Sequence, residues 1–312
     1  SSLMLVTGAG GFLGARVVDH LLGRGFRSVR CLVRPTSDLR RLEEVIRERD
    51  GRDRVEIIKA NLLSRDDCRR LSENTTIIYH LAAGTGTKAF SDAYLNSVVT
   101  TRNLLDAALE NGCLKRFVNI SSFAVYTNRD KPKRRVLDES CPAESHPESR
   151  AEAYCFGKVK QDELVIEYGK KHGLPYVILR PGNIFGPGKK VIPGRVGIDS
   201  FGIFLDFGGV NPIPLTFVDN CAEAVVLAGL APGVTTIPAT LPADYNPKNA
   251  SGGIIGIQSG TTNTTNTPIK GVDGTAIGGA YIICSTGILG KFVKQLDIQM
   301  DDSKTDSGSM MA

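Results

Sequence analysis

The 312-residue sequence has no tryptophan, no CxxC pair and no run of about 18 uninterrupted apolar residues. Without such a run we expect no membrane span. Because the chain opens with SSLMLVTGAGG rather than with a basic and apolar leader, we also expect no signal peptide. The seven cysteines lack the spacing of a metal site, so we predict reduced thiols, no bound metal and a cytoplasmic protein.

Arginine and glutamate are missing from the last part of the chain, after Arg195 and Glu223 respectively. The formal net charge of +5 is too small to favour a nucleic-acid partner. From Gly233 onward the sequence is rich in Gly, Thr, Asn and Ser and contains the run TTNTTNTP. This change predicts two regions, residues 1–232 and an atypical region 233–312, in which we expect short strands, loops and one amphipathic helix over Ile288–Leu296.

Before residue 230, short β-branched runs alternate with longer amphipathic stretches, which is typical of a parallel sheet covered by helices. The predicted strands are Leu3–Val6, Val29–Val33, Val55–Lys59, Ile77–Leu81, Phe117–Ile120 and Tyr176–Leu179. The predicted helices are Gly11–Gly23, Asp38–Arg49, Arg65–Leu71, Ala93–Asn111 and Glu152–His172, with Gly23, Gly112 and Gly173 as C-caps. This order predicts an α/β Rossmann fold, a doubly wound parallel sheet whose ligands bind at the carboxyl ends of the strands.

The first predicted strand runs directly into the motif TGAGGFLG and then into a helix. Gly8, Gly11 and Gly14 allow a tight turn, a close approach of backbone N–H groups to a pyrophosphate, and close packing of the helix on the strand. A glycine motif alone is weak evidence, but its place between a strand and a helix predicts dinucleotide binding.

The end of the second strand indicates which dinucleotide is bound. It reads LVRP, without the acidic residue that would bond an adenosine 2′-hydroxyl. Arg34 can clamp a 2′-phosphate and stack on adenine, with Arg40 and Arg41 nearby, so NADP(H) is favoured over NAD(H). The alternative is that Arg34 stacks on adenine in solvent without discriminating.

Tyr154 and Lys158 stand four residues apart in YCFGK, on one face of a long predicted helix. A tyrosine, with a free pKa of about 10, acts as a base near neutral pH only if its phenolate is stabilised, and the Lys158 ammonium offers that charge. A third group should bind the substrate oxygen. We choose Ser122 at the end of the fifth strand over Ser121, which we expect to stay in the strand. The predicted catalytic residues are therefore Ser122, Tyr154 and Lys158, and Lys158 also has the task of holding the nicotinamide ribose.

Six ordered motifs and one later segment now point to a family. TGAGGFLG, YHLAA, the NxxxTxxNLLDAA stretch from Asn96, SSFAVY, YCFGK, RPGNIFGPG and LTFVDNCAEA resemble the extended short-chain dehydrogenase/reductase superfamily, in its NAD-dependent epimerase/dehydratase branch. The resemblance covers about residues 1–230. It implies that the cofactor is bound, in addition to Arg34 at the end of the second strand, by Gly8, Gly11, Phe12, Leu13, Gly14, Asn61, Leu62, Ala82, Ala83, Tyr154, Lys158 and Pro181. It also implies that Asn183 and Ser122 bind substrate, that Asn96 supports the active-site hydrogen bonds, and that the chain forms a homodimer.

The resemblance implies hydride transfer between nicotinamide C4 and a secondary alcohol or ketone carbon of a small-molecule substrate. Two activities stay open, a sugar-nucleotide epimerase and a ketone reductase of the steroid or flavonoid type. The dehydratase subgroup places Asp-Glu where this sequence has Phe123-Ala124, which disfavours dehydration. A non-catalytic dinucleotide sensor is the alternative of another class, and the intact Ser122, Tyr154 and Lys158 argue against it.

The end of the chain, Gln295–Ala312, faintly resembles the end of type IV pilin or pseudopilin subunits. Residues 233–312 are therefore open to three interpretations: a divergent substrate lid, a grafted assembly module in a chimeric chain, or a tail.

Overall fold

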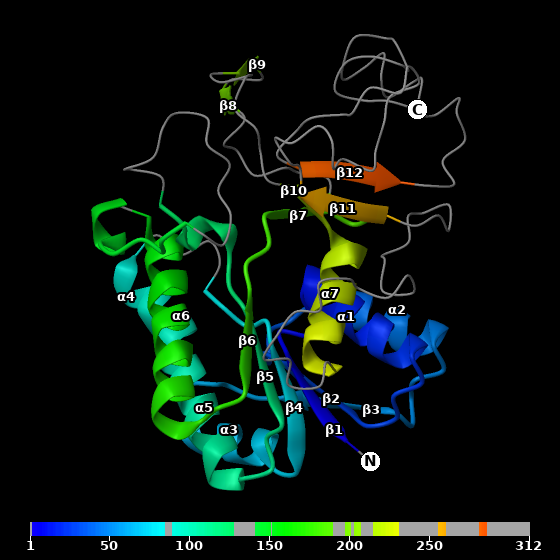
Figure 1. Cartoon of the computed structure of the whole chain (residues 1–312). Coiled ribbons are helices and arrows are strands. Elements are labelled where there is room, and N and C mark those ends of the chain that lie inside the picture. Colours follow the sequence, from blue (N-terminus) through cyan, green and yellow to red (C-terminus); the bar gives the residue numbers. More distant parts are fainter. Residues whose placement is uncertain are drawn as a thin grey trace. The chain divides into compact units, whose positions relative to one another are not determined.

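Six parallel strands form the central sheet of the computed structural model (Figure 1), in the order β3-β2-β1-β4-β5-β6. The strands are β1 (Leu3–Thr7), β2 (Val29–Val33), β3 (Val55–Lys59), β4 (Thr75–His80), β5 (Arg116–Ile120) and β6 (Tyr176–Leu179). This order is that of a Rossmann fold and confirms the predicted α/β class. The structure describes residues 2–84, 89–127, 141–150, 152–189, 197–200, 203–206, 215–230, 255–259 and 281–285.

Helices cover both faces of the sheet because its strands are apolar on both sides. The larger helices are α1 (Phe12–Gly23), α2 (Arg40–Glu48), α3 (Arg65–Ser72), α5 (Thr100–Asn111), α6 (Ala153–His172) and α7 (Val218–Leu230). One buried cluster joins α1, α2 and α7 to the sheet, through residues such as Val17, Leu42 and Val225. The other joins α3, α5 and α6 to the opposite face, through Leu71, Leu104 and Val165.

Glycines end two of the predicted helices. Gly112 and Gly173 have φ angles of 67° and 64° and are the left-handed C-caps of α5 and α6, as predicted. The prediction for Gly23 is wrong: it is the last residue of α1, and Arg24 is the C-cap. The left-handed residue here is Gly25, with φ of 81°, because α1 continues through Gly23 before the chain reverses.

The helix predicted over Ala93–Asn111 is divided. A short helix α4 (Phe90–Ala93) leads into a π-helical segment, Tyr94–Val99, which continues as α5. The Thr100 and Thr101 hydroxyls donate to the carbonyl oxygens of the residues four earlier, Asn96 and Ser97. Such bonds compete with backbone pairing, which is consistent with a wider helical turn at this point.

Short strand pairs follow the main sheet along the chain. β7 (Asn183–Phe185) pairs in parallel with β10 (Leu215–Phe217), and β8 (Gly197–Ser200) pairs with β9 (Ile203–Asp206) as an antiparallel ribbon. The chain divides into two units, Ser1–Val234 and Thr235–Ala312. The described part of the second unit is an antiparallel pair, β11 (Ile255–Ser259) and β12 (Tyr281–Ser285). The helix predicted over Ile288–Leu296 and the pilin-like end lie outside the described residues, and the role of this region stays a prediction.

Among the described helices, none has both the length and the apolar character that crossing a membrane requires. Within the same residues, no group of three or more His, Cys, Asp or Glu side chains is arranged to hold a metal ion.

Candidate functional site

The glycine loop between β1 and α1 is shaped by contacts that only glycine permits. Gly8 has a φ of 70°, which other residues rarely adopt, and its carbonyl accepts the N–H of Gly11 at 3.0 Å. A Cβ on Gly14 would lie 2.1 Å from the Gly8 carbonyl oxygen and 2.8 Å from Ala9 Cα. Helix α1 therefore lies directly on the loop backbone at this point, as the sequence motif predicts.

The first turn of α1 is free to receive an anion. Gly11 is the N-cap, no side chain caps the helix, and the first turn carries no acidic residue. The first N–H groups of a helix have no partner within it, and the helix dipole makes this end positive. Phe12, Leu13 and Gly14 supply these N–H groups, so the loop suits the pyrophosphate of a dinucleotide.

Basic side chains surround the outer edge of this loop. Arg34 is exposed just after β2, and its guanidinium has no partner within the described residues. Arg40 is held by Asp38, whose pKa falls to about 2 because Arg40 donates to its carboxylate. Arg41 donates to the Gly188 carbonyl at 2.8 Å and lies over the Phe12 ring. Lys189 lies over the same ring, with Nζ 5.6 Å from its centre. Of the three predicted arginines, Arg34 is thus the one without a partner among the described residues, while Arg40 is neutralised locally.

The structure brings Ser122 and Tyr154 together. Ser122 follows β5 and is the N-cap of a 3₁₀ turn, where its hydroxyl accepts the Ala124 N–H at 3.2 Å. Tyr154 lies in the first turn of α6, near enough to Ser122 that the serine side chain lowers its pKa. The Cys155 thiol and the Arg150 guanidinium both donate to the Ala124 carbonyl, so the start of α6 is tied to the turn that carries Ser122.

Burial raises the pKa of Tyr154, and the neighbouring Ser122 side chain lowers it by less than burial raises it. The net shift of the Tyr154 pKa is therefore upward, and lowering of this pKa by Lys158 stays a prediction. The Lys158 ammonium is directed instead to the Ile120 carbonyl, at 2.6 Å, and to Gln161 Oε1, at 2.9 Å. Lys158 is 3% exposed, and this burial lowers its own pKa to about 8. It follows that Tyr154 holds its proton near neutral pH.

Ser121 lies one residue beyond β5, which ends at Ile120, so the expectation that it stays in the strand is wrong, but its contacts differ from those of Ser122. It is buried, its N–H bonds the Leu179 carbonyl of β6, and its hydroxyl donates to Asp162 at 2.8 Å. Asp162 also accepts from Asn119 and from Arg180 Nε, which lies 3.0 Å away. Burial raises the pKa of Asp162 despite these partners. These bonds join α6 to the ends of β5 and β6 directly beneath the Ser122 turn, and the sequence did not indicate them.

The RPGNIFGPG segment also meets the Ser122 turn. The Pro181 carbonyl accepts the Phe123 N–H at 2.9 Å, so Pro181 lies beside Ser122 as expected. Asn183 begins β7, is partly buried, and pairs with Leu215 of β10. Its side chain has no partner in the described part of the chain and is available to a ligand.

The remaining predicted residues have mixed surroundings. Asn61 is exposed, and its Oδ1 accepts the Leu63 N–H, whereas the Leu62 side chain packs in the core and contributes little surface to a ligand. Ala82 and Ala83 follow β4 and are partly buried beside Gly8. Asn96 is exposed in the π-helical segment, and its amide donates to the Asp92 carbonyl at 2.8 Å. The structure thus does not join Asn96 to the hydrogen bonds of Tyr154 or Lys158, because that amide is used within its own helix.

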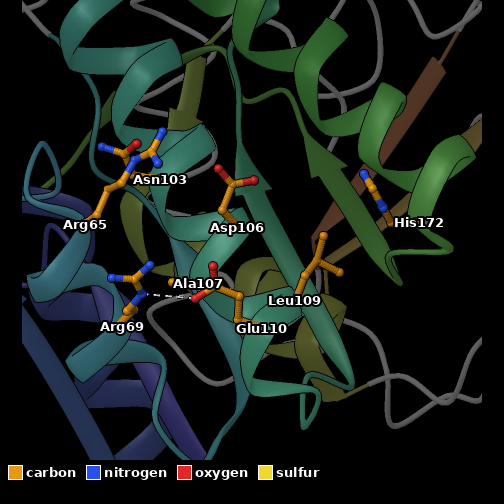
Figure 2. Close-up of a pocket in the computed structure, with 8 residues that line it drawn as sticks. All are labelled: Arg65, Arg69, Asn103, Asp106, Ala107, Leu109, Glu110 and His172. Atoms are coloured by element: carbon orange, nitrogen blue, oxygen red, sulfur yellow. Dashed lines mark hydrogen bonds and ion pairs between the residues drawn. The ribbon is translucent and has the colours of Figure 1, made fainter.

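One cavity, of about 270 Å³, lies away from this edge of the sheet. Figure 2 shows its residues on α3, α5 and the end of α6, with Arg69 paired to Glu110 at 3.1 Å. None of the predicted site residues lines it. We therefore assign the candidate site to the strand ends of β1, β4 and β5, where the glycine loop, Ala82 and Ser122 lie on neighbouring parallel strands.

Known proteins resemble this chain in sequence and in fold. A model of the NAD dependent epimerase/dehydratase family matches residues 4–232. Cinnamoyl-CoA reductase 1 of Petunia hybrida is 30% identical over 188 residues, which are 59% of this chain and 55% of the relative. GDP-mannose 3,5-epimerase 1 of Oryza sativa subsp. indica is 27% identical over 239 residues, covering 71% of this chain and 59% of the relative. The chain thus spans little more than half the length of these curated relatives.

Among solved structures, Pal from Bacillus thuringiensis is similar, with a TM-score of 0.59 and 26% identity, over 73% of this chain and 74% of that one.

Proposed function

The chain belongs to the NAD dependent epimerase/dehydratase family, and from this premise we propose that it transfers a hydride between a nicotinamide dinucleotide and a small-molecule alcohol or ketone. The observation that carries the proposal is the proximity of Ser122 and Tyr154, one strand end away from Ala82 and two from the glycine loop. Phosphate contacts at the loop and proton transfer at Tyr154 are both available at this edge of the sheet.

The glycine loop fits the dinucleotide, because side chains are excluded where its phosphates would approach. When bound, the nicotinamide supplies the hydride that is given or taken at the substrate carbon. Ser122 holds the substrate oxygen by a hydrogen bond, and Tyr154 exchanges a proton with the same oxygen. Because burial keeps Tyr154 protonated near neutral pH, the resting site is prepared to donate a proton, which is what reduction of a ketone needs. Oxidation of an alcohol needs the deprotonated residue and should be favoured at higher pH.

Within this proposal, NADP(H) is the preferred cofactor. A 2′-phosphate attracts a guanidinium, and that of Arg34, at the end of β2, has no partner in the part of the chain that the structure describes. The nearby carboxylate of Asp38 is neutralised by Arg40 and would repel the phosphate only weakly. Arg41 and Lys189, rather than Arg40, contribute further positive charge, since both lie over the Phe12 ring at the glycine loop.

The cofactor proposal is tested by titrating the chain with NADPH and NADH and following nicotinamide fluorescence. We expect tighter binding of NADPH, and we expect Arg34→Ala to weaken NADPH by roughly tenfold, the equivalent of a charged hydrogen bond, while changing NADH little. Arg69→Ala is the matched control, because Arg69 pairs with Glu110 away from this edge of the sheet, and it should leave the ratio of the two affinities close to the wild-type value. Equal loss for both cofactors in Arg34→Ala would mean that Arg34 only stacks on adenine.

A reductase and an epimerase are distinguished by the fate of the cofactor. A reductase consumes one NADPH for each ketone reduced, whereas an epimerase restores its cofactor within each turnover. Arg34, whose guanidinium has no partner among the described residues, lies beside the glycine loop and favours the reductase, because a cofactor that is consumed must be taken up selectively from solution. Incubation with ketones and with sugar nucleotides, monitored at 340 nm and by product analysis, separates the two activities. Binding of NADPH with no conversion of any substrate would favour the sensor instead.

A further inference from the structure

A chain of buried polar side chains runs from the strand beside the glycine loop to Lys158. Its members are Thr7 on β1, His80 on β4, Thr101 on α5 and Gln161 on α6, and all four are 0% exposed. His80 Nδ1 lies 2.9 Å from the Thr7 hydroxyl, and its Nε2 lies 2.8 Å from the Thr101 hydroxyl. Gln161 Nε2 lies 2.8 Å from Thr101, and Gln161 Oε1 accepts from Lys158 at 2.9 Å.

The hydrogens of this chain can be placed in one way. The Thr7 hydroxyl accepts the N–H groups of Leu81 and Ala82, each at 3.1 Å, so both its lone pairs are used and its hydrogen must point to His80 Nδ1. His80 Nδ1 is therefore an acceptor, and Nε2 carries the hydrogen.

The hydrogen bonds at the Lys158 end of the chain lead to the same tautomer of His80. Thr101 donates its hydrogen to the Ser97 carbonyl and so must accept from both His80 and Gln161. Lys158 can only donate, which places the oxygen of the Gln161 amide on its side. The two ends agree on a neutral His80 with its hydrogen on Nε2. Burial and the charge of Lys158 lower the pKa of His80 to about 3, which is consistent with a ring that stays neutral.

We propose that Gln161 is a positioning residue for Lys158, oriented through Thr101 by His80 and Thr7. Gln161 and the Ile120 carbonyl occupy two of the three N–H groups of the ammonium and leave one for a ligand. Because Thr7 also binds the N–H of Ala82 beside Gly8, the same hydrogen bonds link the cofactor loop to Lys158. This inference rests on the proposed function only for the identity of the ligand that takes the third N–H.

The experiment uses the full chain without cofactor, so that its failure is separate from any failure to bind NADPH. The chain has four histidines, and their ring nitrogens are resolved by long-range ¹H–¹⁵N NMR. We expect one ring, identified as His80 by its loss in His80→Gln, to remain neutral with hydrogen on Nε2 from pH 8 down to pH 5. Protonation of that ring with a midpoint near pH 6, or hydrogen on Nδ1, would overturn the arrangement.

The link to Lys158 is tested by its own titration in lysine-labelled protein, with the signal assigned by its loss in Lys158→Met. Besides Gln161, the charged groups facing Lys158 are Asp162 on its own helix, paired with Arg180 after β6, and, once protonated, His80 on β4. Gln161→Met removes the acceptor at similar volume and should move the Lys158 midpoint below about 8, whereas Gln161→Glu adds a negative charge and should move it above that value.

Glu163→Gln is the matched control, since Glu163 is an exposed neighbour paired with Lys160. It should leave the Lys158 midpoint unchanged. Opposite shifts in the two Gln161 variants support positioning by Gln161. Equal midpoints in both variants, or shifts matched by the control, would overturn it. The wild-type histidine measurement decides the hydrogen-bond arrangement even if a variant fails to fold.

Discussion

Replacing Gly14 by alanine should separate α1 from the glycine loop. The added Cβ would lie 2.1 Å from the Gly8 carbonyl oxygen, about 1.4 Å closer than the ~3.5 Å of an ordinary contact. The neighbouring atoms are backbone atoms of Gly8 and Ala9, so no side chain can rotate away. Overpacking of this kind costs typically about 1–3 kcal/mol, and we expect Gly14→Ala to lower the free energy of unfolding by that amount.

The same helix supplies a matched control. The nearest atoms to a Cβ on Gly23 would be those of the Arg49 guanidinium, the first at 3.5 Å, and Gly23 has helical backbone. Gly23→Ala should therefore leave stability unchanged or raise it by up to about 1 kcal/mol. Because the chain has no tryptophan, urea unfolding is best followed by far-ultraviolet circular dichroism.

Cofactor binding gives the second readout for this pair of variants. Displacing the first turn of α1 moves the N–H groups of Phe12, Leu13 and Gly14 together, so Gly14→Ala should weaken NADPH by at least about tenfold, or 1.4 kcal/mol. Gly23→Ala should bind NADPH like the wild type. If Gly14→Ala matched Gly23→Ala in both stability and NADPH affinity, the close packing of α1 on the loop would be refuted.

Three further predictions follow from buried groups. Unfolded His80 takes up a proton near pH 6.5, but the folded ring does so only near pH 3. The contribution of His80 to stability is therefore full above pH 6.5 and is lost as the pH falls, by about 2 kcal/mol between pH 8 and pH 5. Urea unfolding at several pH values should show this loss of stability, and His80→Gln should make the dependence on pH flatter. Tyr79 is fully buried and donates to the Val226 carbonyl at 3.2 Å, so Tyr79→Phe should lower the free energy of unfolding by about 1 kcal/mol. An unchanged free energy of unfolding would mean that this hydrogen bond does not stabilise the fold. Burial raises the pKa of the Cys68 and Cys221 thiols to about 12, whereas Cys113 is exposed, so iodoacetamide at pH 8 should label Cys113 and spare the other two until urea is added, as mass spectrometry of peptides would reveal.

Local patterns in the sequence were sufficient to predict the sheet. All six strands were placed within about two residues, because each is a short β-branched run that is bounded by turns or helices. Ser122 and Tyr154 could also be brought together from sequence, since parallel strands end at one edge and α6 begins beside it. The interruption at Tyr94–Val99 was missed because α- and π-helical turns share the same polar and apolar residues.

The polar chain from Thr7 to Lys158 was beyond sequence reasoning for a different reason. His80 lies between Thr7 and Thr101 in the core. These residues come from four elements, and no spacing along the chain relates them. Two signals were available: Gln161 stands three residues after Lys158 on one helix, and His80 ends a strand whose other residues are mainly apolar. The hydrogen bond from Arg41 to Gly188 is a similar case, since the two residues are 147 positions apart in the sequence.

The central claim is that Tyr154 donates the proton when hydride is transferred at this site. It is tested by supplying NADPH deuterated at nicotinamide C4 together with a ketone that the wild type reduces, and measuring deuterium in the alcohol by mass spectrometry. We expect the wild type to form deuterated alcohol. We expect Tyr154→Phe to bind NADPH with unchanged affinity but to reduce the ketone more slowly, by a factor of about 10²–10⁴. Deuterated alcohol formed by Tyr154→Phe at the wild-type rate would contradict it.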